Sequence, residues 1–524
     1  MLMERIREVA VRLRNGSLTV EELYKQCMQR AKSLQQLNAF LTLTPALAKK
    51  QAEESGERIT QGKAKSVLDG IPVAAKDNFS TACMETTCAS HMLAGYVPPY
   101  TATVVQGLLD EGAVLMGKTN MDEFAMGTGS VDSVHGPVQN VWRHPLLSSE
   151  SSHPAVVRQE GSEVRLDSVD SENDGWFVAG GSSGGSAVAV ASGMCFAALG
   201  SDTGGSVRLP ASHCGVVGFK PTYGLCSRHG LIPLTNSLDV PGIFTKSVDD
   251  VAFVLGAMAG HDPLDSTTVM NPFQSFELPE NISVEGLRVG IPQEFHPPSM
   301  EADAIQAWSK AADIFENAGA VVSKVSLPHI QLSLLCYSVL GPVEIASNMA
   351  RYDGIEYGHR ANGYQSTEEL YAATRHEGFN DIVRGRILAG NYFLLKDNYE
   401  KYFLQAQKVR RLVVEDFCKS FESGIDVFLT PAAVGSAKSY QEFVMFDSRK
   451  RQEIEDCLLL AVNLAGIPAV TVPAALSSQS MPIGIQLIGP SFKEKELLTV
   501  AKWYEQQVEF PRAELEASLR VLDG

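Results

Sequence analysis

The sequence predicts an α/β fold in which a central β-sheet is covered by helices on both faces. Stretches with the apolar period of a helix alternate with short apolar stretches typical of buried strands, and no segment is repeated along the chain. The composition is that of a globular protein, since 44% of the 524 residues are hydrophobic and 20% are charged. One α/β body with a helical insertion accounts for this pattern, so we expect a single domain over residues 1–524.

The N-terminal region predicts three helices. Apolar residues at helical spacing indicate helices near residues 6–14, 20–36 and 46–61. Thr19 and Glu22 form a capping box for the second of them, because each can bond the backbone N–H of the other.

A strand and a helix–strand pair follow. Residues 70–80, GIPVAAKDNFS, predict a buried strand that ends at Lys76, and residues 101–120 predict a helix and then a strand. Within the latter, residues 112–119 (GAVLMGKT) match the phosphate-binding pattern GxxxxGK[ST]. That pattern needs a glycine-rich loop, whereas the variable residues here are apolar and predict the strand itself. We therefore disfavour an ATP-binding loop and expect a buried strand with Lys118 beyond its end.

The segment after the predicted helix–strand pair has a different composition. Residues 146–175 are rich in Ser, Glu and Asp, which is typical of an exposed, poorly ordered insertion. Helical patterns dominate from about 300 to 420, as expected for a helical cap or insertion within the domain. An apolar run at 458–476 contains Asn463 and two prolines, so a helix and then a buried strand are expected there, not a membrane helix. Further strands are predicted at GLRVGIP, VVSKVSLP, DVFLTP, AVTVPAAL and PIGIQLIGP.

Charge and cysteine content narrow the function classes. The formal net charge of -17 argues against a protein that grips nucleic acid through its own basic face, although docking on a partner that holds the nucleic acid stays possible. The basic clusters at 408–411 and 448–451 are interpreted as solvated faces. The nine cysteines include no CxxC pair and no Cys/His metal spacing, which indicates reduced thiols in an intracellular compartment and no metal site.

Two clusters of glycine and serine are the main candidates for chemistry: GGSSGGS at 180–186 and GSDTGGS at 200–206. A flexible linker does not fit, because the residues between them, 187–199, are apolar and would be well buried as a helix. Glycines packed between apolar elements mark close backbone approach. Gly204 and Gly205, just before Ser206, could turn several N–H groups toward one point, which is how an oxyanion hole is built.

A reactive serine also needs a base. Residues 180–184 match the GxSxG nucleophile elbow, but none of the seven histidines downstream lies in a recognisable motif, so that arrangement is disfavoured. Lysine can serve as the base if burial lowers its pKa. Lys76 closes an apolar strand and therefore fits. Asp77 points to the opposite face of that strand and need not pair with it.

Together these motifs resemble the amidase signature family. The resemblance rests on GIPVAAKDNFS, GGSSGGSA and GSDTGGSVRLPASHCGVVGFKPTYG, and it runs from GSLTVEEL to the C-terminal PIGIQLIGP. GKTNMDEFAMG belongs to the same pattern, which explains the match to a phosphate loop. The resemblance implies the amidase-signature fold, with a mixed central sheet covered by helices on both faces.

The resemblance also implies a catalytic triad without histidine. Ser206 is the implied nucleophile, Ser182 the proton relay after a cis Gly181–Ser182 peptide, and Lys76 the base. The implied oxyanion hole is formed by the backbone N–H groups of Thr203, Gly204, Gly205 and Ser206.

Within the family, ASNMARYDGIEYGHR, RHEGFNDIVRGRILAG and AVNLAGIPAVTVP are similar to the glutaminase subunits of tRNA-dependent amidotransferases. Free glutamine carries a carboxylate and an ammonium, so its pocket should present an arginine and an acid. The implied residues are Arg386 and Asp456, with Tyr337 lining the pocket. Arg384, two residues before Arg386, stays open as an alternative carboxylate ligand.

The resemblance implies partners and a location. The B subunit would use ATP and Mg²⁺, contact most of the Glu-tRNA(Gln), and convert it to Gln-tRNA(Gln) with the ammonia that this chain releases from glutamine. The C subunit would hold the two together as a heterotrimer. No cofactor, metal or membrane is expected for this chain. The insertion from about Leu147 resembles animal mitochondrial members, which implies the mitochondrial matrix, although Glu4 and Glu8 are atypical of a targeting peptide.

Two alternative functions remain open. The first is a stand-alone amidase of the family that acts on another amide, such as a lipid or aryl amide. An apolar entry channel in place of Arg386 and Asp456 would favour it. The second is a non-catalytic scaffold with the same fold, against which the intact triad argues.

Overall fold

The computed structural model describes residues 2–147 and 175–520 of the chain. The insertion predicted over 146–175 lies almost wholly outside the described residues.

Strands within these residues form one sheet. They are β1 (Phe40–Leu43), β2 (Pro72–Lys76), β3 (Val114–Thr119), β4 (Ala197–Asp202), β5 (Val217–Lys220), β6 (Val240–Thr245), β7 (Arg288–Pro292), β8 (Val321–Val325), β9 (Val427–Pro431), β10 (Ala469–Leu476) and β11 (Pro482–Ile488). Their order is β1-β3-β2-β4-β6-β5-β10-β11-β9-β7-β8. The sheet is mixed, because β2 lies parallel to β3 and β4, and β7 lies parallel to β8 and β9, whereas the other neighbours are antiparallel.

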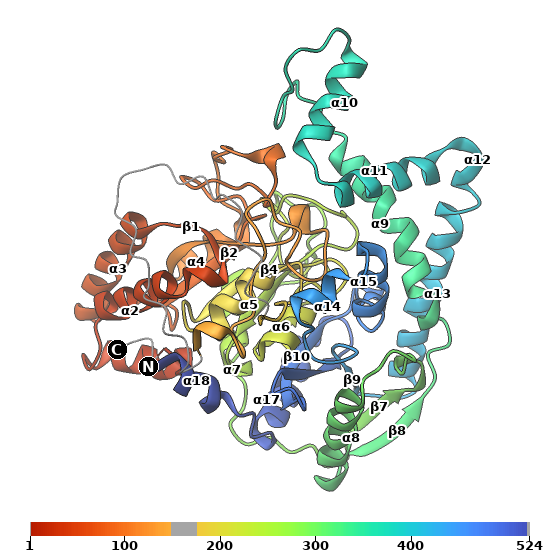
Figure 1. Cartoon of the computed structure of the whole chain (residues 1–524). Helices are drawn as coiled ribbons and strands as arrows, with labels where there is room; N and C mark the ends of the chain where they lie inside the picture. Colours follow the sequence, from red (N-terminus) through yellow and green to blue (C-terminus); the bar gives the residue numbers. More distant parts are fainter. Residues whose placement is uncertain (1, 148–174, 521–524) are drawn as a thin grey trace.

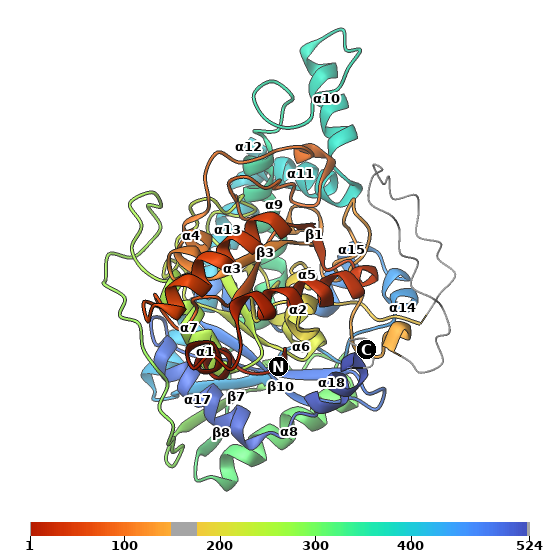
Figure 2. The same ribbon diagram turned by 90° about the vertical axis from the view of Figure 1, so that its left-hand side faces the viewer.

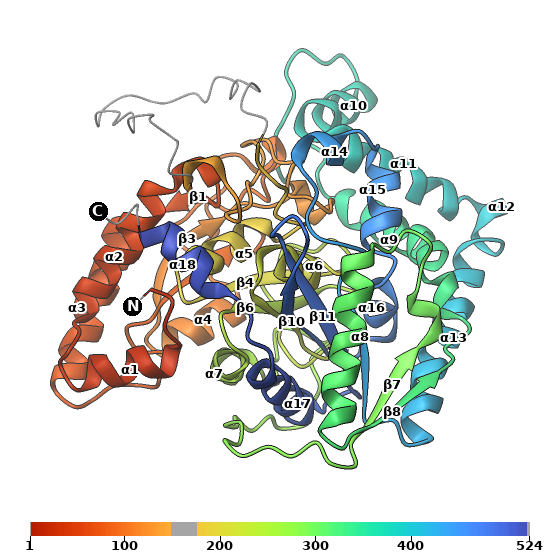
Figure 3. The same cartoon turned by 60° about the horizontal axis from the view of Figure 1, so that its bottom comes forward.

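Helices surround this sheet (Figures 1 and 3). They are α1 (Ile6–Arg14), α2 (Val20–Ser33), α3 (Pro45–Thr60), α4 (Thr103–Asp110), α5 (Gly184–Ala191), α6 (Arg208–Cys214), α7 (Val248–Met258), α8 (Ala302–Asn317), α9 (Ser333–Met349), α10 (Thr367–Gly378), α11 (Asp381–Leu394), α12 (Lys396–Tyr399), α13 (Phe403–Glu422), α14 (Tyr440–Val444), α15 (Ser448–Glu455), α16 (Leu460–Ala465), α17 (Glu494–Gln507) and α18 (Arg512–Arg520).

Helices cover both faces of the sheet, as the fold class predicts. A Cβ at Gly484 of β11 would lie 3.0 Å from Ser212 Oγ of α6, and a Cβ at Gly489, just after β11, would lie 3.1 Å from Leu497 of α17. The two glycines are an odd number of residues apart, so they face opposite sides. The predicted α/β fold with a mixed sheet is therefore confirmed.

The stretch predicted to be helical, 300–420, contains α8 to α13 and the strand β8. Helix α9 packs against α11, α13 and α16. Helix α10 projects away from the rest of the molecule (Figures 1 and 2). Among the described residues, one helical segment, Ile330–Met349, is long and apolar enough to cross a membrane. It includes α9, and its contacts with three other helices are those of a core helix.

Local predictions near the N-terminus are confirmed. The side chain of Thr19 accepts a hydrogen bond from the N–H of Glu22, and the carboxylate of Glu22 accepts one from the N–H of Thr19. All nine cysteines are unpaired.

Two predicted elements differ from the structure. Residues 187–199 were expected to form one buried helix, but α5 ends at Ala191 and the chain enters β4 at Ala197. Gly193, with φ of +76°, lies between the two elements, and glycine adopts that conformation without strain. Lys118 was expected beyond the end of its strand, but it lies within β3 and is fully buried.

The basic clusters at 408–411 and 448–451 are not simply solvated faces. Arg410 donates hydrogen bonds to the carbonyl oxygens of Leu464 and Ser237, at 2.9 Å each. Arg451 lies 3.7 Å from the carboxylate of Asp132. The interpretation as solvated faces is wrong for Arg410, whose guanidinium bonds acceptors inside the fold, and for Arg451, which is partly buried beside Asp132.

Candidate active site

The candidate base lies at the end of a central strand. Lys76 is the last residue of β2, and β4 lies beside β2 in parallel with Ala75 opposite Leu199. The carboxyl ends of parallel strands meet at the same edge of a sheet. This places Lys76 beside Ser201 near the end of β4 and beside the Ser182–Ser183 pair that precedes α5.

Hydroxyl groups surround the amine of Lys76. Its Nζ lies 2.7 Å from the Oγ of Ser182, 2.8 Å from that of Ser183 and 3.0 Å from that of Ser201. The side chain is fully buried. The Gly181–Ser182 peptide is cis, which is the geometry that the resemblance implies.

Burial changes the protonation of Lys76. It lowers the pKa of Lys76 to about 7, although the charges of Asp122, Asp202 and Asp239 oppose the shift. A buried amine loses the hydration that stabilises its charged form. Near pH 7 a large fraction of Lys76 is therefore neutral and able to accept a proton.

The neighbouring acid is kept away from this amine. Asp77 lies 3.1 Å from Nζ of Lys118 and accepts a hydrogen bond of 2.6 Å from the hydroxyl of Thr87. Both charges of the Asp77–Lys118 pair are buried. Successive strand residues point to opposite faces, and this alternation separates the two lysines and gives the acid to Lys118 alone.

The loop that carries Ser206 is fixed by a buried ion pair. Asp202 accepts hydrogen bonds from the N–H groups of Gly205 (2.9 Å) and Val207 (3.1 Å). It also pairs with Arg208 at 2.9 Å, and neither side chain is exposed. Burial alone would raise the pKa of Asp202, but the charge and hydrogen bonds of Arg208 outweigh it and hold the pKa well below its usual range.

The oxyanion hole needs a correction. The resemblance implies N–H groups from Thr203, Gly204, Gly205 and Ser206, but the N–H of Gly205 is already bonded to Asp202. That leaves the N–H groups of Thr203, Gly204 and Ser206, for which no hydrogen-bond partner is found within the part of the chain that the structure describes.

Ser206 is accessible but not yet connected to the relay. Ser206 is partly exposed, whereas the four residues before it are buried. Within residues 2–147 and 175–520, no hydrogen bond joins its hydroxyl to that of Ser182. Catalytic hydrogen bonds often tighten only when substrate binds. The structure thus forms the Lys76–Ser182 contact of the predicted triad and leaves the Ser182–Ser206 contact open.

The candidate glutamine pocket brings together three helices. Tyr337 comes from α9, Arg386 from α11, and Asp456 directly follows α15. A Cβ at Gly204 would lie 3.4 Å from the Tyr337 ring, so the pocket adjoins the loop that carries Ser206. Arg386 donates a hydrogen bond of 3.1 Å to Oε1 of Gln452, whose Nε2 donates one of 3.2 Å to Asp456.

The electrostatics of this pocket suit a charged ligand. Burial raises the pKa of Asp456 to about 7, against hydrogen bonding from Gln452 and the charge of Arg386. Burial also raises the pKa of Tyr337 to about 12, which keeps its hydroxyl protonated. An ammonium bound beside Asp456 would stabilise the carboxylate, because an opposite charge favours the ionised form.

Arg384 has a different environment from Arg386. It donates hydrogen bonds to the carbonyl oxygens of His376 (2.7 Å) and Phe379 (3.2 Å) and pairs with Asp381. These contacts tie the end of α10 to the start of α11. The structure therefore places Arg386, not Arg384, on the side of Asp456.

Several residues of the site were not found from the sequence. Ser183, Ser201 and Gln452 contact the predicted residues directly, and Arg208 holds the loop through Asp202. Gln452 had a signal, because a spacing of four places it on the same helical face as Asp456. The Asp202–Arg208 pair had none, since its spacing belongs to no regular element.

The residues that the structure describes offer no metal site. Within the ranges 2–147 and 175–520, no group of three or more His, Cys, Asp or Glu side chains could hold a metal ion.

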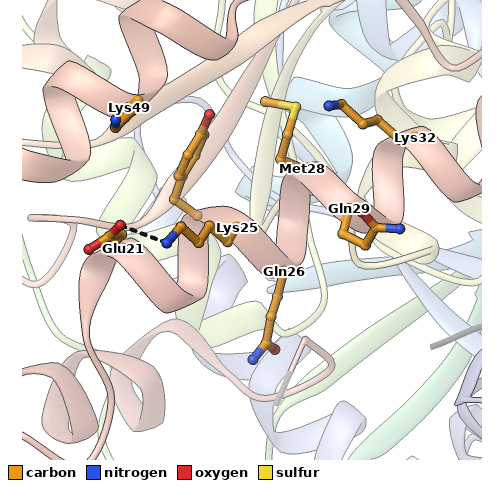
Figure 4. A pocket seen from close by; sticks show the side chains of 8 residues that line it. Glu21, Lys25, Gln26, Met28, Gln29, Lys32 and Lys49 are labelled. Carbon is orange, nitrogen blue, oxygen red and sulfur yellow. Dashed lines mark ion pairs between the residues drawn. The ribbon is translucent and has the colours of Figure 1, made fainter. Parts of the chain in front are cut away.

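Two surface hollows lie apart from this chemistry. One is lined by α2 side chains, including the Glu21–Lys25 ion pair of 2.7 Å, and by Lys49 of α3 (Figure 4). The other, of about 780 Å³, is lined by residues around His91 and Tyr352. Neither is lined by a residue of the predicted triad or of the glutamine pocket.

Comparison with known proteins gives relatives that span almost the whole chain. A family described as Amidase matches residues 22–152 and 172–498. The A subunit of the mitochondrial glutamyl-tRNA(Gln) amidotransferase of Mus musculus is 58% identical over 516 residues, which are 98% of this chain and 96% of the relative. That of Xenopus tropicalis is 57% identical over 97% of this chain and 95% of the relative, and that of Homo sapiens is 56% identical over 98% and 96%.

Solved structures show the same similarity. The A subunit of glutamyl-tRNA(Gln) amidotransferase from Thermotoga maritima matches with a TM-score of 0.73 and 33% identity, over 95% of this chain and 96% of that one. Peptide amidase from Stenotrophomonas maltophilia matches with a TM-score of 0.76 and 27% identity, over 97% of both chains.

Proposed function

This chain belongs to the amidase family, and from that premise we propose that it is the glutamine-hydrolysing A subunit of a mitochondrial glutamyl-tRNA(Gln) amidotransferase. One observation carries the choice of substrate. Arg386 and Asp456 lie on either side of Gln452, and the ring of Tyr337 adjoins the loop that carries Ser206. An arginine and an acid close to each other suit the carboxylate and ammonium of an α-amino acid, whose side-chain amide would reach the serine. The relatives that are 56–58% identical to this chain are all named as the A subunit of the mitochondrial glutamyl-tRNA(Gln) amidotransferase.

The geometry supports a serine mechanism with lysine as the base. Ser206 attacks the amide carbon of glutamine, and its proton passes through Ser182 to neutral Lys76. The N–H groups of Thr203, Gly204 and Ser206 stabilise the negative oxygen of the tetrahedral intermediate. The C–N bond then breaks, and the proton returns along the relay so that the nitrogen leaves as ammonia.

The second half of the reaction uses water. Water attacks the glutamyl ester on Ser206 and gives a proton to Lys76 through the same relay. Glutamate leaves, and Ser206 regains its proton. Glutamine and water have then become glutamate and ammonia, and the enzyme is restored.

The partners follow from the proposed role in a larger enzyme. The B subunit would use ATP and Mg²⁺ to activate Glu-tRNA(Gln) and take up the ammonia, and the C subunit would join the two in a heterotrimer in the mitochondrial matrix. The net charge of -17 supports this division, because a chain so acidic leaves most tRNA contact to a partner.

The competing functions fit less well. A stand-alone amidase for lipid or aryl amides would need an apolar channel where the charged pair of Arg386 and Asp456 lies. A scaffold without activity would have no reason to bury Lys76 against three serine hydroxyls.

The test compares two nitrogen sources in the assembled complex. Ser206→Ala should abolish glutamine-dependent Gln-tRNA formation, because the nucleophile is lost, while free ammonia should still support it. Mass spectrometry of the wild type with glutamine should show a glutamyl ester on Ser206. A Ser206→Ala complex that still hydrolyses glutamine, or a wild type that hydrolyses another amide but not glutamine, would overturn the proposal.

A further inference from the structure

One neutral side chain stands between the two charges of the candidate glutamine pocket. Gln452 accepts a hydrogen bond from Arg386 at its Oε1 and donates one from its Nε2 to Asp456. The reverse amide orientation would place N–H groups against a guanidinium and an oxygen against a carboxylate, so chemistry dictates this one.

The bridge is held by its own helix. Gln452 lies in the last turns of α15, and its backbone carbonyl accepts a hydrogen bond of 3.0 Å from the N–H of Asp456. This bond fixes the backbone of Gln452 relative to that of Asp456, and the side chain of Gln452 reaches Arg386 on α11.

Neither charge of the pocket forms a direct ion pair with another side chain in the part of the chain that the structure describes. Asp132 lies near enough to Arg386, and Arg208 near enough to Asp456, for their charges to interact. Arg386 also interacts with the hydroxyl of Tyr337. Both charges are thus kept ready for a ligand.

From this arrangement we propose that Gln452 is a positioning residue that keeps Arg386 and Asp456 from pairing with each other. The proposal rests on the proposed glutamine substrate. The carboxamide of Gln452 presents an oxygen to the arginine and an N–H to the acid, as the α-carboxylate and α-ammonium of glutamine would. When glutamine binds, Arg386 and Asp456 each replace a hydrogen bond to the neutral carboxamide of Gln452 by one to a charged group of the substrate.

Loss of the bridge would let the charges pair. Arg386 and Asp456 would collapse into a direct ion pair in a partly buried site, and glutamine would have to break that pair before binding. The hydrogen bond from Gln452 also opposes the rise of the Asp456 pKa caused by burial, so the bridge helps to keep this carboxylate charged.

The first test uses steady-state kinetics of the assembled complex. Gln452→Leu should raise the KM for glutamine about tenfold, which is the effect expected from losing one hydrogen bond to a charged group. It should change kcat less than about twofold. Gln452→Glu, of equal size, should raise KM further, because it neutralises Arg386 and repels Asp456. Glu453→Gln is the matched control, because Glu453 lies next along α15, is exposed and contacts Lys450 instead.

A second test measures coupling. In an Asp456→Asn background no ion pair can form, so Gln452→Leu should raise KM by clearly less than in the wild type. The crystal structure of Gln452→Leu should show an Arg386–Asp456 ion pair.

Each outcome decides the proposal. The positioning role of Gln452 is overturned if Gln452→Leu leaves the KM for glutamine unchanged or lowers it. It is also overturned if the effects of Gln452→Leu and Asp456→Asn on KM are additive. If the Gln452→Leu chain does not assemble into the complex, an unchanged KM for glutamine in Gln452→Glu overturns the positioning role in the same way. A wild-type complex without glutaminase activity overturns the proposed function itself. If Arg386→Ala raises the KM for glutamine while the Gln452 variants leave it unchanged, only the positioning role of Gln452 is overturned.

Discussion

The base side and the pocket side of the candidate site are built in different ways. On the base side, Lys76 and the Asp202–Arg208 pair are fully buried. Lys76 and Asp202 end the neighbouring strands β2 and β4, and Arg208 begins α6. On the pocket side, Arg386 and Gln452 are only partly buried, and they come from helices outside the sheet. The comparison shows that the sheet edge fixes the chemistry, whereas the choice of substrate depends on how separate helices meet.

The largest effect is expected at the base. Lys76→Ala should lower kcat for glutamine about 10³- to 10⁴-fold, because proton transfer from Ser206 loses its acceptor. Lys76→Arg should not restore the rate, since arginine cannot lose its proton at working pH. Glutaminase kinetics measure both, and ammonia-dependent Gln-tRNA formation shows whether each variant assembles. An active Lys76→Arg variant would contradict lysine as the base.

The next effect concerns the loop that carries Ser206. Asp202→Asn should lower the free energy of unfolding by about 3–5 kcal/mol, because Arg208 is left buried without its counter-charge. Asp426→Asn is the control, because its pair with Arg288 is exposed and should contribute less than about 1 kcal/mol. Urea unfolding measures both values. Equal losses would show that the loop is not held by this pair.

A smaller effect is expected on the pocket side. Arg386→Ala should raise the KM for glutamine about ten- to hundredfold with little change in kcat, because its contact is equal in the ground and transition states. The variant should also discriminate little against glutamine amidated at its α-carboxyl, which the wild type should reject. Arg384→Ala is the matched control. If Arg384→Ala loses this preference and Arg386→Ala keeps it, the assignment of the carboxylate ligand is reversed.

The last prediction uses pH to separate the base side, which sets kcat, from the pocket side, which sets the KM for glutamine. Below pH about 7 Lys76 gains a proton and cannot accept one, so kcat should fall about tenfold per pH unit. Asp456 also gains a proton there and loses its attraction for the ammonium, so KM should rise. Both profiles come from initial rates between about pH 5.5 and 8.5. Asp456→Asn should flatten the KM profile and leave the kcat profile, whereas a flat wild-type kcat profile would contradict a pKa of Lys76 near 7.

The same contrast explains what could be predicted from the sequence. The strand that ends at Lys76 and the glycine-rich loop before Ser206 follow from local pattern, whereas the relay role of Ser182 came only from the resemblance to the amidase signature family. The bond from Gly205 to Asp202 depends on loop geometry, and no residue pattern indicates it. The helix expected over 187–199 was wrong because apolar runs do not distinguish a buried helix from a buried strand.

The pocket side was harder for a physical reason. The direction of a helical side chain depends on the rotation of its helix, and a shift of two residues changes the face. The sequence therefore left Arg384 and Arg386 as alternatives, and the packing of α11 against α9 separates them. The spacing of four from Asp456 placed Gln452 on the same helical face, but its bond to Arg386 arises only where α11 and α15 meet.

The alternation of β2 makes the site sensitive to the length of the chain. Lys76 faces three serine hydroxyls, and Asp77 faces Lys118 on the other side of the strand. A strand that slips by one residue turns every side chain to the opposite face. A single inserted or deleted residue in β2 would offer a carboxylate to the serines and set two lysines against each other. Within this strand, substitutions of small apolar residues should therefore be tolerated far better than any change in the number of residues.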